Sequence, residues 1–455
     1  MIFCLSFYLK ATSVNYIYGD QVHYLVMTNS LLEDGDLDLK NDHEEKRYND
    51  YYEGYLTPHV LLGDFGENTE HWYSIHNPGL SIVLVPILLF GGIKGAFVFM
   101  LLVSFSLLLA SFFWVKRVIN NNFYALLSVL VLFFSPFYMG LSGYIFADLV
   151  LALMLVLSFL IICNQKKSNS LYFLFGIILG CFPWIHVKGG LIAALLGLLM
   201  LFQISKIKLP IKGKIFKALL FVVPSFLLLI LFEWKLYQWY GVVLPTSTFA
   251  SSQMFEISSF KTVLAVLFDS SKGLLVNNPM YFLFFLGLPL WARINKSQFI
   301  KVLLVVFPML VLQLSFGDWW GGWSSPGRYY LEYLPLLLPS IAFSLMILKK
   351  LILKIIVFVL LILQTLFSVV FILIDDQWVM PDEFPPLFSK LKEFTGLDFF
   401  GILPQFNKFA EIVNSRDVVV YILLLFIFVL FLYGLKINKR LFSSLIKVEK
   451  NTFKK

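Results

Sequence analysis

The sequence predicts an all-α polytopic membrane protein with about twelve transmembrane helices. Hydrophobic residues make up 59% of the 455 residues, charged residues only 14%, and the mean hydropathy is +0.81. A soluble domain carries roughly a quarter of its residues as charged side chains, so this composition excludes one. The apolar runs are long enough to match the roughly 20 residues per helix that a bilayer requires, and they lack the alternation of barrel strands.

The distribution of charge orients these helices. Glu449 is the only acid on one side of the predicted membrane, and well over half of the 36 Lys and Arg lie on that side, in pairs such as Lys116 with Arg117 and Lys166 with Lys167. By the positive-inside rule this acid-poor side faces the cytoplasm. Because the cations flank membrane helices in short loops, the pI near 9.1 does not indicate a nucleic-acid partner.

The chain begins with an apolar segment, residues 1–17, that carries Lys10 and is interpreted as the first helix. Residues 18–94 follow as a long first outer loop, in which the amphipathic stretch 22–32 predicts an interfacial helix on the membrane surface. Residues 78–92 are apolar but too few to span a bilayer, so we expect a re-entrant hairpin. If this segment spanned, every later basic loop would lie outside.

The remaining apolar runs are predicted spans, and together with the rest of the chain they form a single integral membrane domain over residues 1–455. The predicted spans lie near 95–115, 121–140, 146–164, 170–186, 189–205, 217–235, 277–293, 299–316, 329–347, 352–374 and 417–435. The outer face then receives the loops 141–148, 236–276, 317–328 and 375–416. The last outer loop, 375–416, is rich in Pro and aromatic residues suited to the membrane interface.

Two carboxylates stand where chemistry is expected. Asp20 directly follows the first apolar segment, with His23 one turn further on, and a partly desolvated carboxylate can act as a general base. Asp148 heads a span whose next nine residues are apolar, and intramembrane acids are usually functional. The alternative for both is an acidic residue that caps the start of a helix.

Cations of the predicted outer face come from distant parts of the chain. His186 and Lys188 lie in PWIHVKGG, Lys272 in FDSSKGLL, and Arg328 after a Gly-rich turn that also contains Asp318. The Arg328 guanidinium at a helix start is suited to binding a phosphate. The alternatives are an ion pair of Arg328 with Glu332, lysines that extend to lipid headgroups, and a turn-capping role for Asp318.

Two further patterns have plain structural alternatives. The cluster Trp319, Trp320 and Trp323 suits an interfacial aromatic belt better than a sugar-stacking platform. The acids of residues 34–45 have the spacing of a calcium loop, but Leu39 replaces the glycine of its sharp turn, so an acidic surface turn is favoured.

No residue is assigned as a metal ligand from the sequence. Cys4, Cys163 and Cys181 lie in apolar segments without zinc-site spacing and are expected to pack against neighbouring apolar side chains. No cofactor is required by any motif, although a divalent cation remains possible.

Several motifs, taken in order, resemble the bacterial GT-C superfamily of polytopic glycosyltransferases, nearest the protein O-mannosyltransferase and lipid A aminoarabinose transferase type. They are GDQVHYLVMTNSLLEDGDLDLKN, SIHNPGLSIVLVPILLFGG, Asp148 at the head of a span, PWIHVK, LFDSSKGLLVNNPMYF and DWWGGWSSPGRYYLEYLPLL. The resemblance covers most of the chain to about residue 345. It implies transfer of a sugar from a polyprenyl-phosphate donor to a lipid, glycan or protein acceptor on the outer face of the bacterial inner membrane.

The resemblance also implies roles for residues of this chain. Asp20 matches the catalytic acid of the first outer loop and Asp148 the second acid, while Arg328, Lys188 and His186 would hold the lipid phosphate. Gln21 departs from the pattern, because many relatives have a second acid there, which argues against an Asp-Asp metal site.

The alternative function is a flippase, polymerase or transporter of lipid-linked saccharides, and a catalytically inactive scaffold is a third possibility. A transporter is expected to place charged residues near the membrane midplane. Here the charged candidates, Asp148, Lys188, Glu233 and Arg328, fall at the predicted outer ends of spans, which favours the enzyme.

Overall fold

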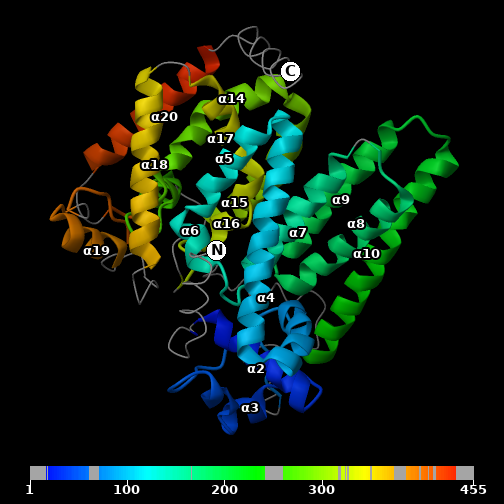
Figure 1. Cartoon of the computed structure of the whole chain (residues 1–455). Helices are drawn as coiled ribbons and strands as arrows, with labels where there is room; N and C mark the ends of the chain where they lie inside the picture. Colours follow the sequence, from blue (N-terminus) through cyan, green and yellow to red (C-terminus); the bar gives the residue numbers. More distant parts are fainter. Residues whose placement is uncertain are drawn as a thin grey trace. The chain divides into compact units, whose positions relative to one another are not determined.

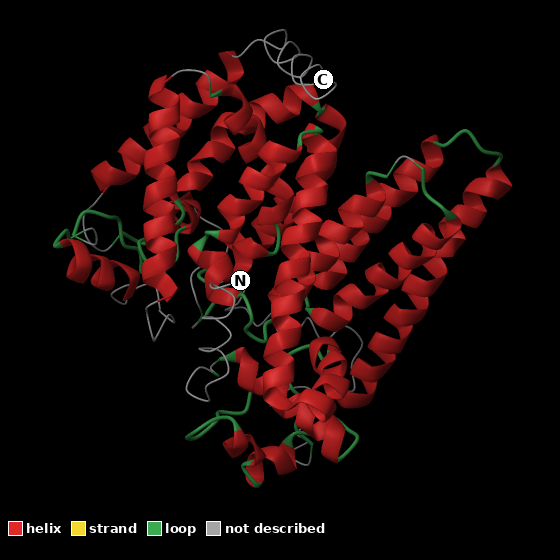
Figure 2. Cartoon of the chain, in the orientation of Figure 1, coloured by secondary structure: helices red, strands yellow, loops and turns green. Residues whose placement is uncertain are grey.

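The computed structural model describes residues 17, 19–60, 71–164, 166–240, 260–315, 319–322, 324, 327–348, 351–372, 386–398, 401–407, 409–412 and 417–436. Two isolated β-bridges join described residues, Val60 with Ser74 and Phe406 with Ile412, and helices make up most of the described chain (Figure 2). The prediction of an all-α protein is confirmed.

Among the described residues, six helices are long and apolar enough to cross a membrane, and five shorter helices are also apolar. Each has a counterpart among the spans predicted from residue 95 onward, while the predicted first helix lies outside the described residues except for Ile17. The protein is therefore a polytopic integral membrane protein, as predicted.

The chain divides into two compact units, each built from two stretches of sequence. Unit 1 comprises residues 1–110 and 141–256, and unit 2 comprises residues 111–140 and 257–455. The sequence analysis treated all of this as one membrane domain, and each unit is described separately below.

Unit 1 contains the predicted first outer loop, residues 18–94, and a group of apolar helices (Figure 1). Its helices are α2 (Asp20–Glu33), α3 (Lys40–Glu44), η2 (Arg47–Asp50), most of α4 (Gly79–Ile119), α7 (Ala147–Ile162), α8 (Asn169–Ile185), α9 (Gly189–Lys206) and α10 (Ile211–Tyr240).

Close packing of α8 on α10 organises unit 1. A Cβ atom at Gly176 would collide with the carbonyl oxygen of Phe221, and one at Gly180 would lie 2.6 Å from Cβ of Leu228. The Ser225 hydroxyl donates a hydrogen bond of 2.8 Å to the carbonyl oxygen of Gly176. Small residues at the contact let two membrane helices approach, which is how such helices gain packing energy in lipid.

A reversal of the chain lies within α4, at the end of the predicted 78–92 segment. Gly92 has a non-helical backbone, with φ 57° and ψ −162°, and a Cβ atom at Gly95 would lie only 3.1 Å from the carbonyl oxygen of Ile87. In a straight helix, residues eight apart are about 12 Å apart along the axis, so the chain turns back here. Its insertion into the membrane remains a prediction.

Helix α2 matches the predicted interfacial helix but is more deeply packed than an amphipathic pattern implies. Its buried residues are Gln21, Val22, His23, Tyr24, Leu25, Val26, Met27, Thr28 and Ser30. Against the start of α4, the Ser81 hydroxyl donates to the Tyr24 carbonyl oxygen at 2.9 Å. Helix α2 is therefore held inside unit 1 and gives its first turn a fixed position.

The acidic turn that follows α2 is stabilised by protein groups. Arg47 Nη1 lies 2.7 Å from Asp34 and its Nε lies 2.9 Å from Glu45, while Asp38 accepts the backbone N–H of Trp72 at 2.8 Å. Among the described residues these carboxylates do not form a cation-binding group. The structure thus supports the surface turn over the calcium loop.

Unit 2 contains the remaining helices, beginning with the last turns of α4. They are α5 (Asn122–Phe133), most of α6 (Pro136–Leu141), α12 (Phe260–Phe268), α13 (Leu274–Asn277), η3 (Pro279–Phe282), α14 (Leu283–Ile294), α15 (Lys296–Leu314), α16 (Arg328–Leu331), α17 (Leu334–Ile347), α18 (Leu351–Ile372), α19 (Pro386–Thr395) and α20 (Asp417–Lys436).

Three predicted spans of unit 2 are interrupted near prolines. Pro136 begins α6 after a break in the predicted span 121–140, Pro279 begins η3, and Pro335 lies at the start of α17. Proline lacks a backbone N–H and disfavours helix at the residue before it, so these helices restart there. The hydropathy pattern alone does not locate such breaks.

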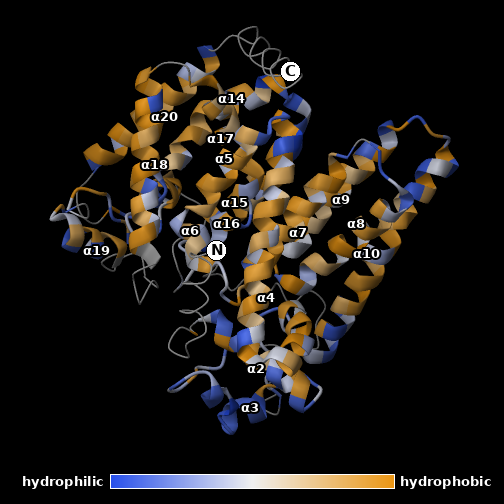
Figure 3. Cartoon of the chain, in the orientation of Figure 1, coloured by the Kyte–Doolittle hydropathy of each residue, from blue (hydrophilic) through white to orange (hydrophobic). Residues whose placement is uncertain are grey.

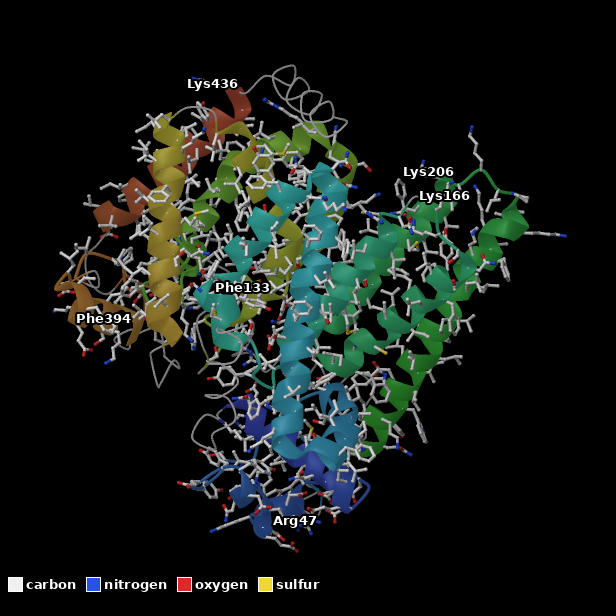
Figure 4. The ribbon with its side chains drawn as sticks, in the orientation of Figure 1. Arg47, Phe133, Lys166, Lys206, Phe394 and Lys436 are labelled. Atoms are coloured by element: carbon white, nitrogen blue, oxygen red, sulfur yellow. The ribbon has the colours of Figure 1, made fainter. Side chains whose placement is uncertain are left out.

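Hydrophilic residues lie toward the ends of the apolar helices within each unit (Figure 3). In unit 1, Lys166 and Lys206 lie toward one end of the helices and Arg47 toward the other, and Lys167 Nζ contacts Gln203 at 3.1 Å (Figure 4). In unit 2, Lys436 and Phe394, which is in α19, lie toward opposite ends (Figure 4).

Candidate functional site

Unit 1 brings the two predicted acids to one region through a buried hydrogen bond. The side chain of Gln21, next to Asp20, accepts the backbone N–H of Ile145 at 3.0 Å, and Ile145 lies three residues before Asp148. Both partners of this bond are fully buried. The start of α2 and the start of α7 are therefore fixed against each other.

Neither acid is the N-cap of its helix. Gly19 is the N-cap of α2 and Phe146 that of α7, and neither makes a side-chain cap hydrogen bond. Asp20 and Asp148 lie in the first turns, where the positive end of the helix dipole favours a carboxylate. Simple capping does not account for either residue.

Three histidines gather beside Asp20. Asp20 Oδ1 lies 4.0 Å from His76 Nε2, and these side chains are 17% and 14% exposed. The ring of His23 stacks on that of His59, with centroids 3.9 Å apart, and His59 Nδ1 lies 3.3 Å from His76 Nε2. One ligand atom from each of the three rings lies within 4.8 Å of the others.

Burial keeps the central imidazole of this group neutral. Desolvation lowers the pKa of His23 to about 2, assisted by repulsion from His76 and His59 and opposed by the charge of Asp20. Burial also lowers the pKa of His59. Neutral imidazoles offer lone pairs, so the group can accept hydrogen bonds or bind a metal ion.

A second pair forms at the start of α7. A carboxylate oxygen of Asp148 and a ring nitrogen of His186 lie within 4.8 Å, and the Asp148 side chain is fully buried. His186 Nδ1 accepts the backbone N–H of Lys188 at 3.2 Å, which leaves the hydrogen of a neutral ring on Nε2. The half-buried Lys188 is the N-cap residue of α9.

The loop bearing His76 is tied to the segment bearing His186. Asn77 Nδ2 donates to the carbonyl oxygen of Pro183 at 2.5 Å, and a Cβ atom at Gly79 would lie 2.6 Å from the carbonyl oxygen of Trp184. We call the start of α2 together with 59–60, 74–79, 145–148 and 183–188 the unit 1 site. It contains Asp20, His23, Asp148, His186 and Lys188, five of the predicted residues.

In unit 2, Lys272 is a buried structural cation. Its side chain is 1% exposed, and Nζ donates to the carbonyl oxygens of Ser324 at 2.6 Å and Gly322 at 3.3 Å. The alternative that Lys272 extends to lipid headgroups is therefore wrong, because its ammonium group is satisfied inside the protein. Lys272 helps to hold residues 319–322, 324 and 327, which we call the glycine turn.

Asp269, which the sequence analysis did not single out, shapes the chain around Lys272. Its Oδ1 accepts the N–H groups of Ser271 at 2.8 Å and Lys272 at 2.6 Å, and its Oδ2 accepts that of Phe406 at 2.9 Å. Burial raises the pKa of Asp269 to about 7, opposed by these N–H donors and by Lys272. The sequence signal was Asp followed by Ser-Ser-Lys-Gly, a side-chain-to-backbone turn pattern.

Arg328 begins α16 directly after the glycine turn and is 9% exposed. Gly327 has φ 79°, and a Cβ atom there would overlap the ring of Phe137. Trp319 and Trp320 are buried, so these two form neither an exposed belt nor an open sugar platform. Asp318 and Trp323 lie outside the described residues.

Comparison of the sequence with protein-family models and with curated proteins finds no match. Among solved structures, ArnT from Cupriavidus metallidurans in the apo state matches 76% of this chain with a TM-score of 0.53 and 12% identity. ArnT bound to undecaprenyl phosphate matches the same share with a TM-score of 0.50. The chain has a GT-C-like fold.

The chain aligns with only part of the ArnT chain. The aligned region spans 58% of the apo ArnT chain and 59% of the lipid-bound one. The expected GT-C fold is confirmed, and at this level of identity the likeness concerns the fold alone. The residues of the unit 1 site and the glycine turn carry the functional argument.

Proposed function

We propose that this protein is a glycosyltransferase that moves a sugar from a polyprenyl-phosphate-linked donor to a lipid, glycan or protein acceptor. The observation that carries the proposal is the buried bond of 3.0 Å between Gln21 and the backbone of Ile145, because it fixes the segments of Asp20 and Asp148 together. Two acids in one site match what the sequence resemblance implies. The ArnT neighbour bound to undecaprenyl phosphate supports the class of donor.

In this proposal Asp20 is the general base. It is the more exposed of the two acids, at 17% of its side chain, so an acceptor hydroxyl can approach it. Asp20 takes the hydroxyl proton as the acceptor oxygen bonds to C1 of the sugar, and the bond from C1 to the phosphate oxygen breaks on the opposite face. The polyprenyl phosphate leaves with the bonding electrons.

Asp148 has a supporting role in unit 1. Its full burial beside His186 suits a carboxylate that orients a ring rather than one that meets a bulky acceptor. His186 and Lys188 are the unit 1 candidates for contacting the lipid phosphate, because a lysine ammonium group stabilises growing negative charge on a leaving group. Arg328 of unit 2 is a further candidate phosphate ligand.

We assign the reaction to the outer face of the bacterial inner membrane. The basis is the positive-inside pattern of the short basic loops, which puts the acidic first loop outside. Within unit 1 the loop with Arg47 and the basic loops with Lys166 and Lys206 lie toward opposite ends, in agreement with this orientation (Figure 4).

The test is the glycolipid and glycoprotein profile of cells that carry Asp20→Asn in place of the intact chain, measured by mass spectrometry. Loss of a general base lowers the rate by roughly 100- to 10,000-fold, so one sugar modification should disappear. Asp50→Asn, an exposed acid of the same loop, is the matched control and should leave the profile unchanged.

An unchanged profile for Asp20→Asn at normal protein level would overturn the assignment of Asp20. A flippase or transporter predicts a different result, in which the lipid-linked precursor accumulates on the cytoplasmic leaflet. A lost modification with the donor lipid accumulating on the outer leaflet supports the transferase.

A further inference from the structure

We propose that His23, His59 and His76 bind one divalent transition-metal ion of the zinc class in unit 1, with Asp20 at the edge of its coordination sphere. This inference concerns a metal site and does not depend on sugar transfer. Its ligands are imidazoles, which distinguishes it from an Asp-Asp site, against which Gln21 argues.

The distances between the rings are close to those of a metal site. Two ligands bound tetrahedrally to zinc at about 2.0–2.1 Å are roughly 3.3 Å apart. His59 Nδ1 and His76 Nε2 lie 3.3 Å apart, and the ligand atoms of all three rings lie within 4.8 Å. Movements on the order of 1 Å would bring three nitrogens onto one ion.

The backbone holds the three rings in place from two sides. His23 lies on α2 among buried residues of the same helix, so the backbone position of His23 is fixed. The other two rings lie on segments joined by a hydrogen bond of 2.9 Å from Ile75 N–H to the His59 carbonyl oxygen and by the bridge between Val60 and Ser74. The backbone that carries the three ligands is therefore fixed, whereas the stacked rings of His23 and His59 must rotate before their nitrogens can face one ion.

The chemistry of the three rings selects the kind of ion. Imidazole nitrogen suits zinc, copper, cobalt and nickel, whereas magnesium and calcium prefer oxygen ligands. His71 and His43 do not belong to the group, since His71 pairs with Asp38 at 2.5 Å and His43 packs against Tyr48 and Trp72. Three of the six histidines thus converge at one place.

Asp20 lies close enough to the three histidines to contact a bound ion. Its Oδ1 lies 4.0 Å from His76 Nε2, within reach of the fourth position directly or through one water molecule. The partial exposure of Asp20 and His76 leaves a path for the ion. A bound metal would link α2 to the segments 59–60 and 74–76 and would hold Asp20 in a single orientation.

The test uses the full-length protein, purified in detergent through a tag without histidine and freed of metal with a chelator. Cobalt(II) is then added, and bound metal is counted by elemental analysis while the visible spectrum is recorded. We expect one cobalt ion per chain, visible bands of low-coordinate cobalt, and loss of those bands when zinc is added in excess.

Variants separate metal binding from folding. His59→Ala should weaken binding by at least about 100-fold, while His59→Cys, which replaces one zinc ligand by another, should retain it. His71→Ala is the matched control and should bind as the intact chain does. Thermal unfolding should shift upward with zinc in the intact chain and the control, but not in His59→Ala.

Three results would overturn the inference: no stoichiometric metal in the intact chain, equal binding by His59→Ala, or loss of binding in His71→Ala. In each case the three rings would be a packed structural group only. Failure here leaves the sugar-transfer proposal standing, because the Asp20→Asn profile is measured without reference to metal. Binding with an unchanged Asp20→Asn profile would support the metal site and reject the catalytic role of Asp20.

Discussion

The unit 1 site and the glycine turn of unit 2 place ionisable groups in opposite ways. In unit 1, three imidazoles pack on one another beside Asp20, and burial favours the neutral form of His23. In unit 2, Lys272 and Asp269 are buried and are satisfied by backbone groups. The unit 1 site thus contains neutral imidazoles and a partly exposed carboxylate. In the glycine turn, by contrast, the charged groups are hydrogen-bonded to the backbone and stabilise the loop.

This difference separates residues that can react from residues that position others. A buried charge must be paired or hydrogen-bonded, and once it is, little of its bonding capacity remains for a substrate. Lys272 is therefore a positioning residue for the glycine turn, which precedes Arg328. Asp20 keeps 17% of its side chain exposed, so a substrate can approach it.

The largest effect is expected at Gly327. Gly327→Ala forces a Cβ atom into the ring of Phe137 at φ 79°, so the free energy of unfolding should fall by about 2–4 kcal/mol. Gly322→Ala, in the same turn at φ 68° with no atom within 4 Å of its Cβ position, should cost only about 1 kcal/mol. Chemical denaturation in detergent compares the two, and equal losses would contradict the packing argument.

Lys272→Met comes next. Methionine fills a similar volume but leaves the carbonyl oxygens of Ser324 and Gly322 without their donor, at a cost of about 2–3 kcal/mol. The variant should also weaken binding of the donor lipid, because the turn before Arg328 loosens. Exposed Lys261→Met serves as the control, and equal stability of the two variants would show that the buried ammonium group is dispensable.

Gln21→Met tests the bond that carries the functional proposal. The backbone N–H of Ile145 would lose its acceptor in a buried site, so stability should fall by about 1–2 kcal/mol. Transfer should fall more than stability predicts, because the segments of Asp20 and Asp148 would no longer be fixed. The check is transfer activity measured under conditions where the variant is fully folded. Unchanged activity there would show that the bond between Gln21 and Ile145 is not needed for transfer.

The smallest effect is a pH dependence at Asp269. The folded-state pKa near 7 lies above that of the unfolded chain, so the folded protein binds the proton more tightly and stability falls as pH rises. Between pH 6 and 7.5 the loss should be about 1 kcal/mol. Asp269→Asn should remove this dependence of the unfolding temperature on pH. If the dependence persists in the variant, another titrating group causes it.

Several elements were predictable because local pattern decides them. Eleven apolar helices lie where hydropathy placed them, and the turn near Gly92 lies where the 78–92 segment is too short to span. The interruptions at Pro136, Pro279 and Pro335 could have been read from the prolines themselves, since each removes a helical hydrogen bond.

The candidate site was only partly predictable. Asp20 and Asp148 stood out because each carboxylate borders an apolar run. His59 and His76 did not, because 16 other residues separate them and only the pairing of Val60 with Ser74 brings their rings together. The burial of Lys272 was also missed, because hydropathy places a lysine at the surface and cannot foresee carbonyl acceptors from residues 322 and 324.

By itself, the sequence determined the class of protein and the positions of the apolar helices, and its basic loops predict an orientation. These follow from composition and from interactions with the bilayer, which act on each segment separately. Only the tertiary structure decided which polar groups meet: Gln21 with Ile145, His23 with His59 and His76, and Lys272 with the glycine turn. Such contacts join distant residues, and their free energy depends on burial and geometry that exist only once the chain is packed.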